Sequence, residues 1–247
     1  GAAARRAYDL GKPVIAFKLG RSAVGRVIAT THTGAIAGAD DVAEAFFRDH
    51  GILRVETFEA LFETPQLVMG YRPPKGRRAA VFTGTGGAAA MVVDRLGLAG
   101  IEVVPPPKKI IDEMATKGIH ITDAPLTDLP MGRGDGPVYP TLIKAFYESD
   151  HCDVIVAVQG STASQRPDSV RERVLDAGRG PKPLASFLGP SAAEALGILQ
   201  RGGAAGFRTP EACADAVRAY CEWRAPVAHP AVYAEVAAKL QLSLQKA

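Results

Sequence analysis

The residue best suited to covalent chemistry in this sequence is His32, in the segment Thr31-His32-Thr33-Gly34-Ala35. Its neighbours are small or carry hydroxyl groups, so two backbones can approach the imidazole, and the threonine hydroxyls can hydrogen-bond an oxyanion. A neutral imidazole is an effective nucleophile near neutral pH, because its ordinary pKa is about 6.5. The segment therefore fits a phosphoryl acceptor, and the alternative is an exposed loop histidine with no chemical role.

A second candidate is the turn Gly84-Thr85-Gly86-Gly87, which stands between an expected strand and an expected helix. Backbone amides at the start of a helix, with the helix dipole behind them, form an anion site. The spacing matches a dinucleotide fingerprint only weakly, because Glu102 is poorly placed to reach a ribose. A phosphate or a phosphorylated side chain is thus a better guest than NAD, and a plain structural turn is the alternative.

Polar residues also follow the expected strand at 153–158, in the run Gln159-Gly160-Ser161-Thr162-Ala163-Ser164. They stand at the carboxyl end of a strand, where open α/β folds bind ligands. Closing a loop and capping the next helix is the simpler interpretation of this run. Neither this run nor the other histidines show metal-ligand spacing, so we expect no metal site.

Composition restricts the class of protein. The chain has 247 residues, 47% hydrophobic and 22% charged, with a formal net charge of +3. That composition predicts a soluble globular protein. The near balance of charges argues against binding nucleic acid. No apolar stretch is long enough for a membrane span, so no membrane partner is expected. The three cysteines have no paired spacing, which favours a reducing, cytoplasmic compartment.

Short apolar runs alternate with helical periodicity, which predicts an α/β fold with parallel sheets. A linker is expected around Pro73-Pro74, and the segments 20–38 and 123–140 are expected to be irregular. Strands are expected at 13–19, 53–55, 78–83, 101–104, 153–158 and 183–188 and before Phe207. Helices are expected at 40–50, 58–62, 88–96, 109–116, 141–149, 171–177, 192–199, 210–223 and 232–245.

A weak internal repeat joins the two ends of the chain. The segment 11–17 resembles 181–187, and each is followed by a Gly-containing loop, a helix, a short strand and a helix after Thr57 or Thr209. We therefore expect two similar α/β domains, the first truncated at its N-terminal side. Their predicted limits are 1–66 and 77–225, with a linker at 67–76 and a C-terminal helix within 226–247.

Residues 11–22 and 31–38 together resemble the phosphohistidine segment of the nucleoside-diphosphate-forming acyl-CoA synthetases and of the succinyl-CoA synthetase α subunit. Residues 78–223 resemble the second flavodoxin-like domain of the same family. The resemblance implies two flavodoxin-like, three-layer domains and a reversible reaction in which acid, CoA and ATP give acyl-CoA, ADP and phosphate. It also implies that His32 carries the phosphoryl group, and that Thr31, Thr33, Gly34, Thr85, Gly86 and Gly87 bind phosphate.

The resemblance further implies partners: a CoA-binding Rossmann domain and an ATP-grasp domain, which lies either downstream in a longer chain or on another subunit. CoA, ATP or ADP, Mg²⁺ and a small carboxylic acid would then act in the complete enzyme, with no cofactor held tightly by this chain. Apolar surface left by two incomplete α/β faces suggests a homo-oligomer or covering neighbours.

Two segments depart from the family's pattern, and two alternative functions remain open. Ala124-Pro125-Leu126-Thr127-Asp128-Leu129 replaces the family's Asn-Pro-Val-Asp-Leu, and Ala88-Ala89-Ala90 ends the glycine turn. A non-catalytic regulatory or CoA-sensing module, as in acyltransferase fusions, is the first alternative. A flavin- or dinucleotide-binding protein is the second.

Overall fold

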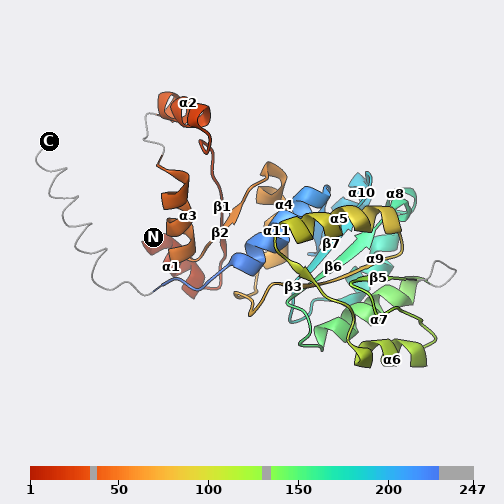
Figure 1. Cartoon of the computed structure of the whole chain (residues 1–247). Coiled ribbons are helices and arrows are strands. Elements are labelled where there is room, and N and C mark those ends of the chain that lie inside the picture. The colour runs from red at the N-terminus through yellow and green to blue at the C-terminus, as the bar shows by residue number, and fades with distance from the viewer. Residues whose placement is uncertain (34–37, 130–134, 228–247) are drawn as a thin grey trace, which may run out of the picture.

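The computed structural model describes residues 1–33, 38–129 and 135–227. Figure 1 shows two parts: a small two-stranded sheet with its helices near the N-terminus, and a larger sheet covered by helices on both faces. We refer to these as the small sheet and the large sheet. Both are entirely parallel, as the sequence predicted for an α/β chain.

The small sheet pairs β1 with β2, in a register that sets Val14 opposite Ile52 and Phe17 opposite Val55. A threonine caps α4, because the Thr57 hydroxyl accepts a hydrogen bond from the Ala60 amide at 3.4 Å. The elements of this part are α1 (Ala2–Asp9), β1 (Val14–Phe17), α2 (Ala23–Thr33), α3 (Asp40–Asp49), β2 (Ile52–Val55) and α4 (Phe58–Val68).

The large sheet has the order β4-β3-β6-β7-β8, and β5 lies beside the end of β3. Its strands are β3 (Arg78–Thr83), β4 (Glu102–Val103), β5 (Leu126–Asp128), β6 (Val154–Gln159), β7 (Leu184–Leu188) and β8 (Ala205–Phe207). Its helices are α5 (Gly86–Leu98), α6 (Lys108–Thr116), α7 (Asp135–Tyr147), α8 (Ser161–Gln165), α9 (Ser169–Arg173), the 3-10 turn η1 (Leu175–Ala177), α10 (Ala193–Arg201) and α11 (Pro210–Glu222). This is the doubly wound order of flavodoxin-like folds.

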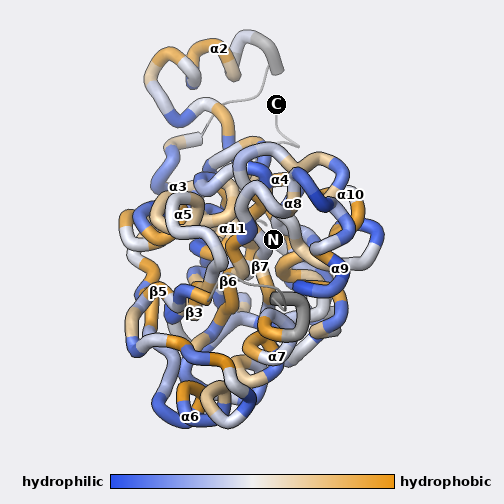
Figure 2. Tube along the Cα trace, turned by 90° about the vertical axis from the view of Figure 1, so that its right-hand side faces the viewer, coloured by the Kyte–Doolittle hydropathy of each residue, from blue (hydrophilic) through white to orange (hydrophobic). Residues whose placement is uncertain are grey.

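Alternate residues of β6 serve opposite faces of the large sheet. Val154 and Val156 join the core beneath α5 and α11, whereas Ile155 and Ala157 join the core beneath α6 and α7. All six residues of β6 are buried, as expected of a parallel strand covered on both faces. Figure 2 shows apolar colouring along β6 and β7 inside the molecule.

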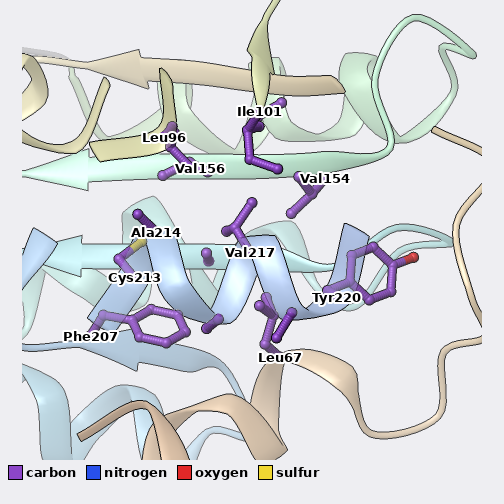
Figure 3. Packing of buried hydrophobic residues seen from close by; sticks show 14 of the residues in the cluster. Leu67, Leu96, Ile101, Val154, Val156, Phe207, Cys213, Ala214, Val217 and Tyr220 are labelled. Carbon is purple, nitrogen blue, oxygen red and sulfur yellow. The ribbon is translucent and has the colours of Figure 1, made fainter. Parts of the chain in front are cut away.

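The core beneath α11 crosses from the large sheet to the small one. Figure 3 shows Val217 and Tyr220 of α11 lying between Val154 of β6 and Leu67 of α4. Leu53 and Val55 of β2 belong to the same buried cluster. The two sheets are therefore joined by continuous apolar packing through α4 and α11.

Several predicted boundaries were wrong. Segment 20–38 was expected to be a loop, but α2 begins at Ala23, where the Ser22 hydroxyl accepts a hydrogen bond from the Gly25 amide at 3.0 Å. An N-terminal cap and a run of Val, Ile, Ala and Arg outweigh the Gly and Thr content there. Segment 123–140 was expected to be irregular, but it contains β5 and the start of α7.

Helix α4 also extends past its predicted end at 62, through Pro65, to Val68. Leu67 and Val68 are both buried, so the first residues of the predicted linker are part of the core, because apolar packing outweighs the lost backbone hydrogen bond. The predicted domain limits stay predictions. The predicted C-terminal helix at 232–245 lies outside the described residues.

Candidate functional site

The turn after β3 is held in place by a small hydrogen-bond network. The Gly84 amide donates to the Tyr139 hydroxyl at 2.8 Å, and the Thr85 amide donates to the Thr83 hydroxyl at 2.9 Å. Tyr139 is buried in α7, and its hydroxyl also donates to the Val158 carbonyl at 3.3 Å. These bonds fix the direction in which the chain enters α5.

The first turn of α5 is open to a ligand. Gly86 and Gly87 are exposed, and a methyl group built on either would meet no atom within 4 Å. The first amides of a helix have no partner within the helix, and the helix dipole places partial positive charge there. Gly86 and Gly87 thus offer donors to an anion at the carboxyl end of β3, and Thr85 precedes them in an extended conformation.

Neighbouring turns come together at the same edge of the large sheet. A Cβ at Gly160, which follows β6, would lie 2.5 Å from Thr85 Cγ2, so only glycine allows this approach. A Cβ at Gly189, which follows β7, would lie 3.7 Å from the Ala88 methyl group. Gly160, the second residue of the run at 159–164, therefore lies directly against Thr85 of the glycine turn. Sequence reasoning missed Tyr139 and the reason for Gly160, because both depend on contacts between distant segments.

His32 lies in the last turn of α2, and the placement of its side chain and that of Thr33 is not described. Gly34 lies outside the described residues. Thr31 is exposed, and its hydroxyl donates to the Val27 carbonyl at 2.7 Å and lies 3.1 Å from the Ile28 carbonyl oxygen. In this arrangement the Thr31 hydroxyl proton is used by the helix backbone, and the hydroxyl oxygen can still accept a hydrogen bond.

The structure does not bring α2 to the first turn of α5. Figures 1 and 2 both show α2 standing apart from the rest of the molecule. Among the described residues, α2 makes no extensive contact with another helix or strand. Val24, Val27 and Ile28 are exposed on it, at 70%, 67% and 53% of their surface, which leaves an apolar patch on the helix that carries His32.

A charge network lies at the carboxyl ends of β1 and β2. The Arg54 guanidinium donates to Glu44 Oε2 at 2.6 Å and to both oxygens of Asp40, the nearer at 2.8 Å. Arg21 donates to Asp40 at 3.2 Å and lies 3.3 Å from Glu56. Hydrogen bonding from Arg54 holds the pKa of the Asp40 carboxyl below its usual range. This network fixes the start of α3 and leaves Arg21 beside the chain that leads into α2.

The remaining reactive groups are poorly placed for chemistry. All three cysteines are buried, and burial raises the pKa of the Cys221 thiol to about 12, so it remains a thiol near neutral pH. Within the described ranges, no group of three or more His, Cys, Asp or Glu side chains is placed to hold a metal ion. None of the helices described there is both long and apolar enough to cross a membrane.

Comparison with known sequences identifies the small-sheet part. Residues 1–68 match the family described as the succinyl-CoA ligase like flavodoxin domain. Two relatives from Pyrococcus furiosus match most of the chain. They are the alpha subunits of acetate–CoA ligase [ADP-forming] II, 27% identical over 84% of this chain, and of acetate–CoA ligase [ADP-forming] I, 28% identical over 86%. The chain spans 47% of the length of each relative.

A solved structure matches nearly all of the fold. It is the dinucleotide forming acetyl-coenzyme A synthetase 1 of Ca. Korarchaeum cryptofilum, in complex with phosphate and ADP. The match has a TM-score of 0.70 and 27% identity, and it covers 98% of this chain and 51% of that one. The matching domain family at residues 1–68, the two ligase subunits and this solved structure agree: over most of its length the chain is similar to ADP-forming acyl-CoA synthetases.

Proposed function

We propose that this chain is the phosphohistidine and flavodoxin-like portion of an acid–CoA ligase that interconverts acid, CoA and ATP with acyl-CoA, ADP and phosphate. The similarity to two ADP-forming acetate–CoA ligase subunits over most of the chain carries this proposal. The complete enzyme would add a CoA-binding domain and an ATP-grasp domain, in the same chain or another. CoA, the nucleotide and Mg²⁺ would be bound there, together with a small carboxylic acid.

His32 is the phosphoryl carrier in this proposal. A ring nitrogen attacks the phosphorus of an acyl phosphate, the bond between phosphorus and the carboxylate oxygen breaks, and the free carboxylate leaves. The phosphoryl group then passes from His32 to ADP and gives ATP. Its position in the last turn of α2, in the segment matched by the family, supports this role.

The first turn of α5 is the proposed phosphate site. A phosphohistidine carries close to two negative charges near pH 7, as other phosphorylated side chains do. Gly86 and Gly87 would donate amides to its oxygens, and the helix dipole would stabilise the charge by up to ~2 kcal/mol in a partly buried site. Thr85 would direct these amides, and Thr31, Thr33 and Gly34 would surround the imidazole.

The test is phosphorylation of the full-length gene product that contains this chain, incubated with Mg²⁺ and ATP labelled in its γ-phosphate. We expect label that is stable in alkali, lost in acid and absent from His32→Ala. His120→Ala is the matched control, because His120 is an exposed histidine outside the segment 31–38 and its variant should keep the label. A folded enzyme that binds CoA but takes up no label would favour the regulatory-module alternative.

A further inference from the structure

Helices α4 and α11 occupy equivalent places in the internal repeat, and each carries an acidic residue six positions after its capping threonine. Glu63 follows Thr57, and Asp215 follows Thr209. Both acidic residues are buried, at 3% and 7% exposure. Helix α4 packs against β8 and α11, and α11 packs against β2, so each helix reaches across to the other sheet.

Asp215 binds the corner where β2 ends and α4 begins. One carboxylate oxygen accepts hydrogen bonds from the Glu56 amide at 2.6 Å, the Thr57 amide at 2.8 Å and the Thr57 hydroxyl at 3.1 Å. The other oxygen accepts from Arg218 at 2.7 Å, and Arg218 also donates to the Arg54 carbonyl of β2 at 3.1 Å. Both carboxylate oxygens of Asp215 therefore accept hydrogen bonds. All of these bonds except the one from Arg218 come from the small-sheet part.

Glu63 makes the reciprocal but weaker contact. Its Oε1 lies 3.4 Å from Nη1 of Arg208, which directly precedes Thr209 at the start of α11. Neither carboxylate oxygen of Glu63 has a hydrogen-bond partner among the described residues. The two contacts are thus related by the repeat and differ in strength.

We propose that Asp215 is a positioning residue that sets the orientation of the His32-bearing part of the chain relative to the proposed phosphate site. Helix α11 packs against α5, whose first turn is that site, and Asp215 on α11 binds the residues directly after β2. The carboxyl edge of the small sheet is therefore connected to α11 by hydrogen bonds, and α11 is connected by packing to the helix that offers Gly86 and Gly87. The catalytic consequence of positioning by Asp215 rests on the proposed function, whereas the structural role of Asp215 does not.

Trp223 provides an independent reporter of this junction. Its indole N–H donates to the Gly51 carbonyl at 2.8 Å, and its ring lies edge-on to Tyr8, with 5.9 Å between the ring centroids. Trp223 ends α11, while Gly51 and Tyr8 belong to the small-sheet part. Opening of the junction would expose this indole proton to exchange, although it touches neither Asp215 nor Thr57 in the hydrogen-bond network.

The first experiment is hydrogen exchange by NMR on the 247-residue chain. In Asp215→Asn we expect exchange of the Glu56 and Thr57 amides and of the Trp223 indole proton to quicken by about tenfold or more, since hydrogen bonds to a charged acceptor are lost. Exchange in β6 should stay unchanged. Glu211→Gln is the matched control, because Glu211 pairs with Arg95 within the large-sheet part and should change none of these rates.

Two outcomes would overturn the proposal. Faster exchange at Glu56 and Thr57 without any change at the Trp223 indole would make Asp215 a local cap. An equal increase in β6 would mean that Asp215 stabilises the whole fold. If Asp215→Asn does not fold, Thr57→Val removes one of the three bonds to the shared oxygen and should quicken exchange at the same positions by a smaller factor.

The second experiment separates the catalytic consequence from the proposed function. In the full-length enzyme, Asp215→Asn should slow the appearance of label on His32 by about tenfold but leave its final extent unchanged, because misorientation lowers a rate whereas misfolding removes active molecules. Asp215→Glu should restore part of the rate. An unchanged rate, or a loss of extent alone, would contradict positioning. A wild-type enzyme without label would contradict the proposed function and leave the exchange result intact.

Discussion

The strands of the two sheets differ most in how completely they are covered. All six residues of β6 are buried between helices on both faces, whereas all four residues of β1 are only half-buried. Apolar burial contributes ~25 cal/mol per Å² of apolar surface removed from water, so the stability of the molecule is concentrated in the large sheet. The proposed chemistry at His32 belongs to the part with the least packing, and the proposed phosphate site belongs to the part with the most.

The sharpest test of this comparison exchanges one phenylalanine in each sheet for alanine. Phe207 of β8 is fully buried, and Phe17 of β1 is half-buried and lies edge-on to Phe58. We expect Phe207→Ala to lower the free energy of unfolding by ~3–5 kcal/mol, because it leaves a cavity. Phe17→Ala should cost ~1 kcal/mol, since less apolar surface returns to water. Urea unfolding measures both, and equal losses would contradict the comparison.

The capping threonines allow a smaller test of the same kind. Thr209 accepts from the Ala212 amide at 3.1 Å, and Thr57 accepts from the Ala60 amide at 3.4 Å but also donates to Asp215. Thr209→Ala should cost ~1 kcal/mol for the lost cap. Thr57→Ala should cost ~2 kcal/mol, because a hydrogen bond to a carboxylate is lost as well.

Urea midpoints of the two threonine variants, with Thr64→Ala as a helical control, decide between these values. Thr64 is a buried threonine of α4 whose hydroxyl has no hydrogen-bond partner among the described residues. If Thr209→Ala proves the more costly of the two capping substitutions, the contact between Thr57 and Asp215 contributes little to stability.

Much of the large sheet was predictable from local pattern, because a buried parallel strand such as 153–158 is a continuous apolar run bounded by turn signals. The glycine turn was also predictable from local pattern, because its glycines stand between a predicted strand and a predicted helix. Helix α2 was not predictable in this way. Its Gly, Ser and Thr content is typical of a loop, and the single cap from Ser22 that starts the helix did not stand out in the sequence.

The junction lay beyond sequence reasoning for a different reason. Asp215 and Thr57 are 158 residues apart, and nothing in either segment marks the other as its partner. The repeat aligned Thr57 with Thr209, yet it could not show that the two helices pack against each other. The approach of Gly160 to Thr85 is likewise a property of neighbouring strands rather than of either segment.

Acid sensitivity provides a test in which two carboxyl groups of the small-sheet part, one in the charge network and one buried against α11, contribute with opposite sign. Hydrogen bonding from Arg54 lowers the pKa of Asp40 from 3.8, so its contribution to stability is present above pH 3.8 and is lost as pH falls through the lowered value. Burial raises the pKa of Glu63 from 4.5, against the opposing effect of Arg208. Its contribution is therefore present below pH 4.5 and is lost as pH rises through the raised value.

Urea midpoints measured from about pH 3 to about pH 8 test both signs. Asp40→Asn should reduce the fall of the urea midpoint at the acid end. Glu63→Gln should flatten the dependence of the midpoint on pH above pH 4.5. Glu59 and Arg208 are the charged groups that act on Glu63, and the buried Cys213 thiol lies near enough to be affected by it. If Glu63→Gln steepens the profile above pH 4.5, Glu63 is stabilised as a carboxylate and the contact with Arg208 is stronger than its 3.4 Å separation indicates.

The smallest expected effect lies on α2. Val27 is exposed, and lysine is a better helix former than valine, so Val27→Lys should change the free energy of unfolding of the 247-residue chain by less than ~0.5 kcal/mol. Val217→Lys is the contrasting substitution, because Val217 is fully buried in α11 and an unpaired ammonium group there should prevent folding. Gel filtration and urea unfolding of the two variants complete the comparison. A loss of stability in Val27→Lys, together with a shift to a smaller species, would show that a second copy of the chain covers this face of α2. An unchanged elution volume and midpoint would leave the helix that carries His32 as the least supported element of the fold in this chain.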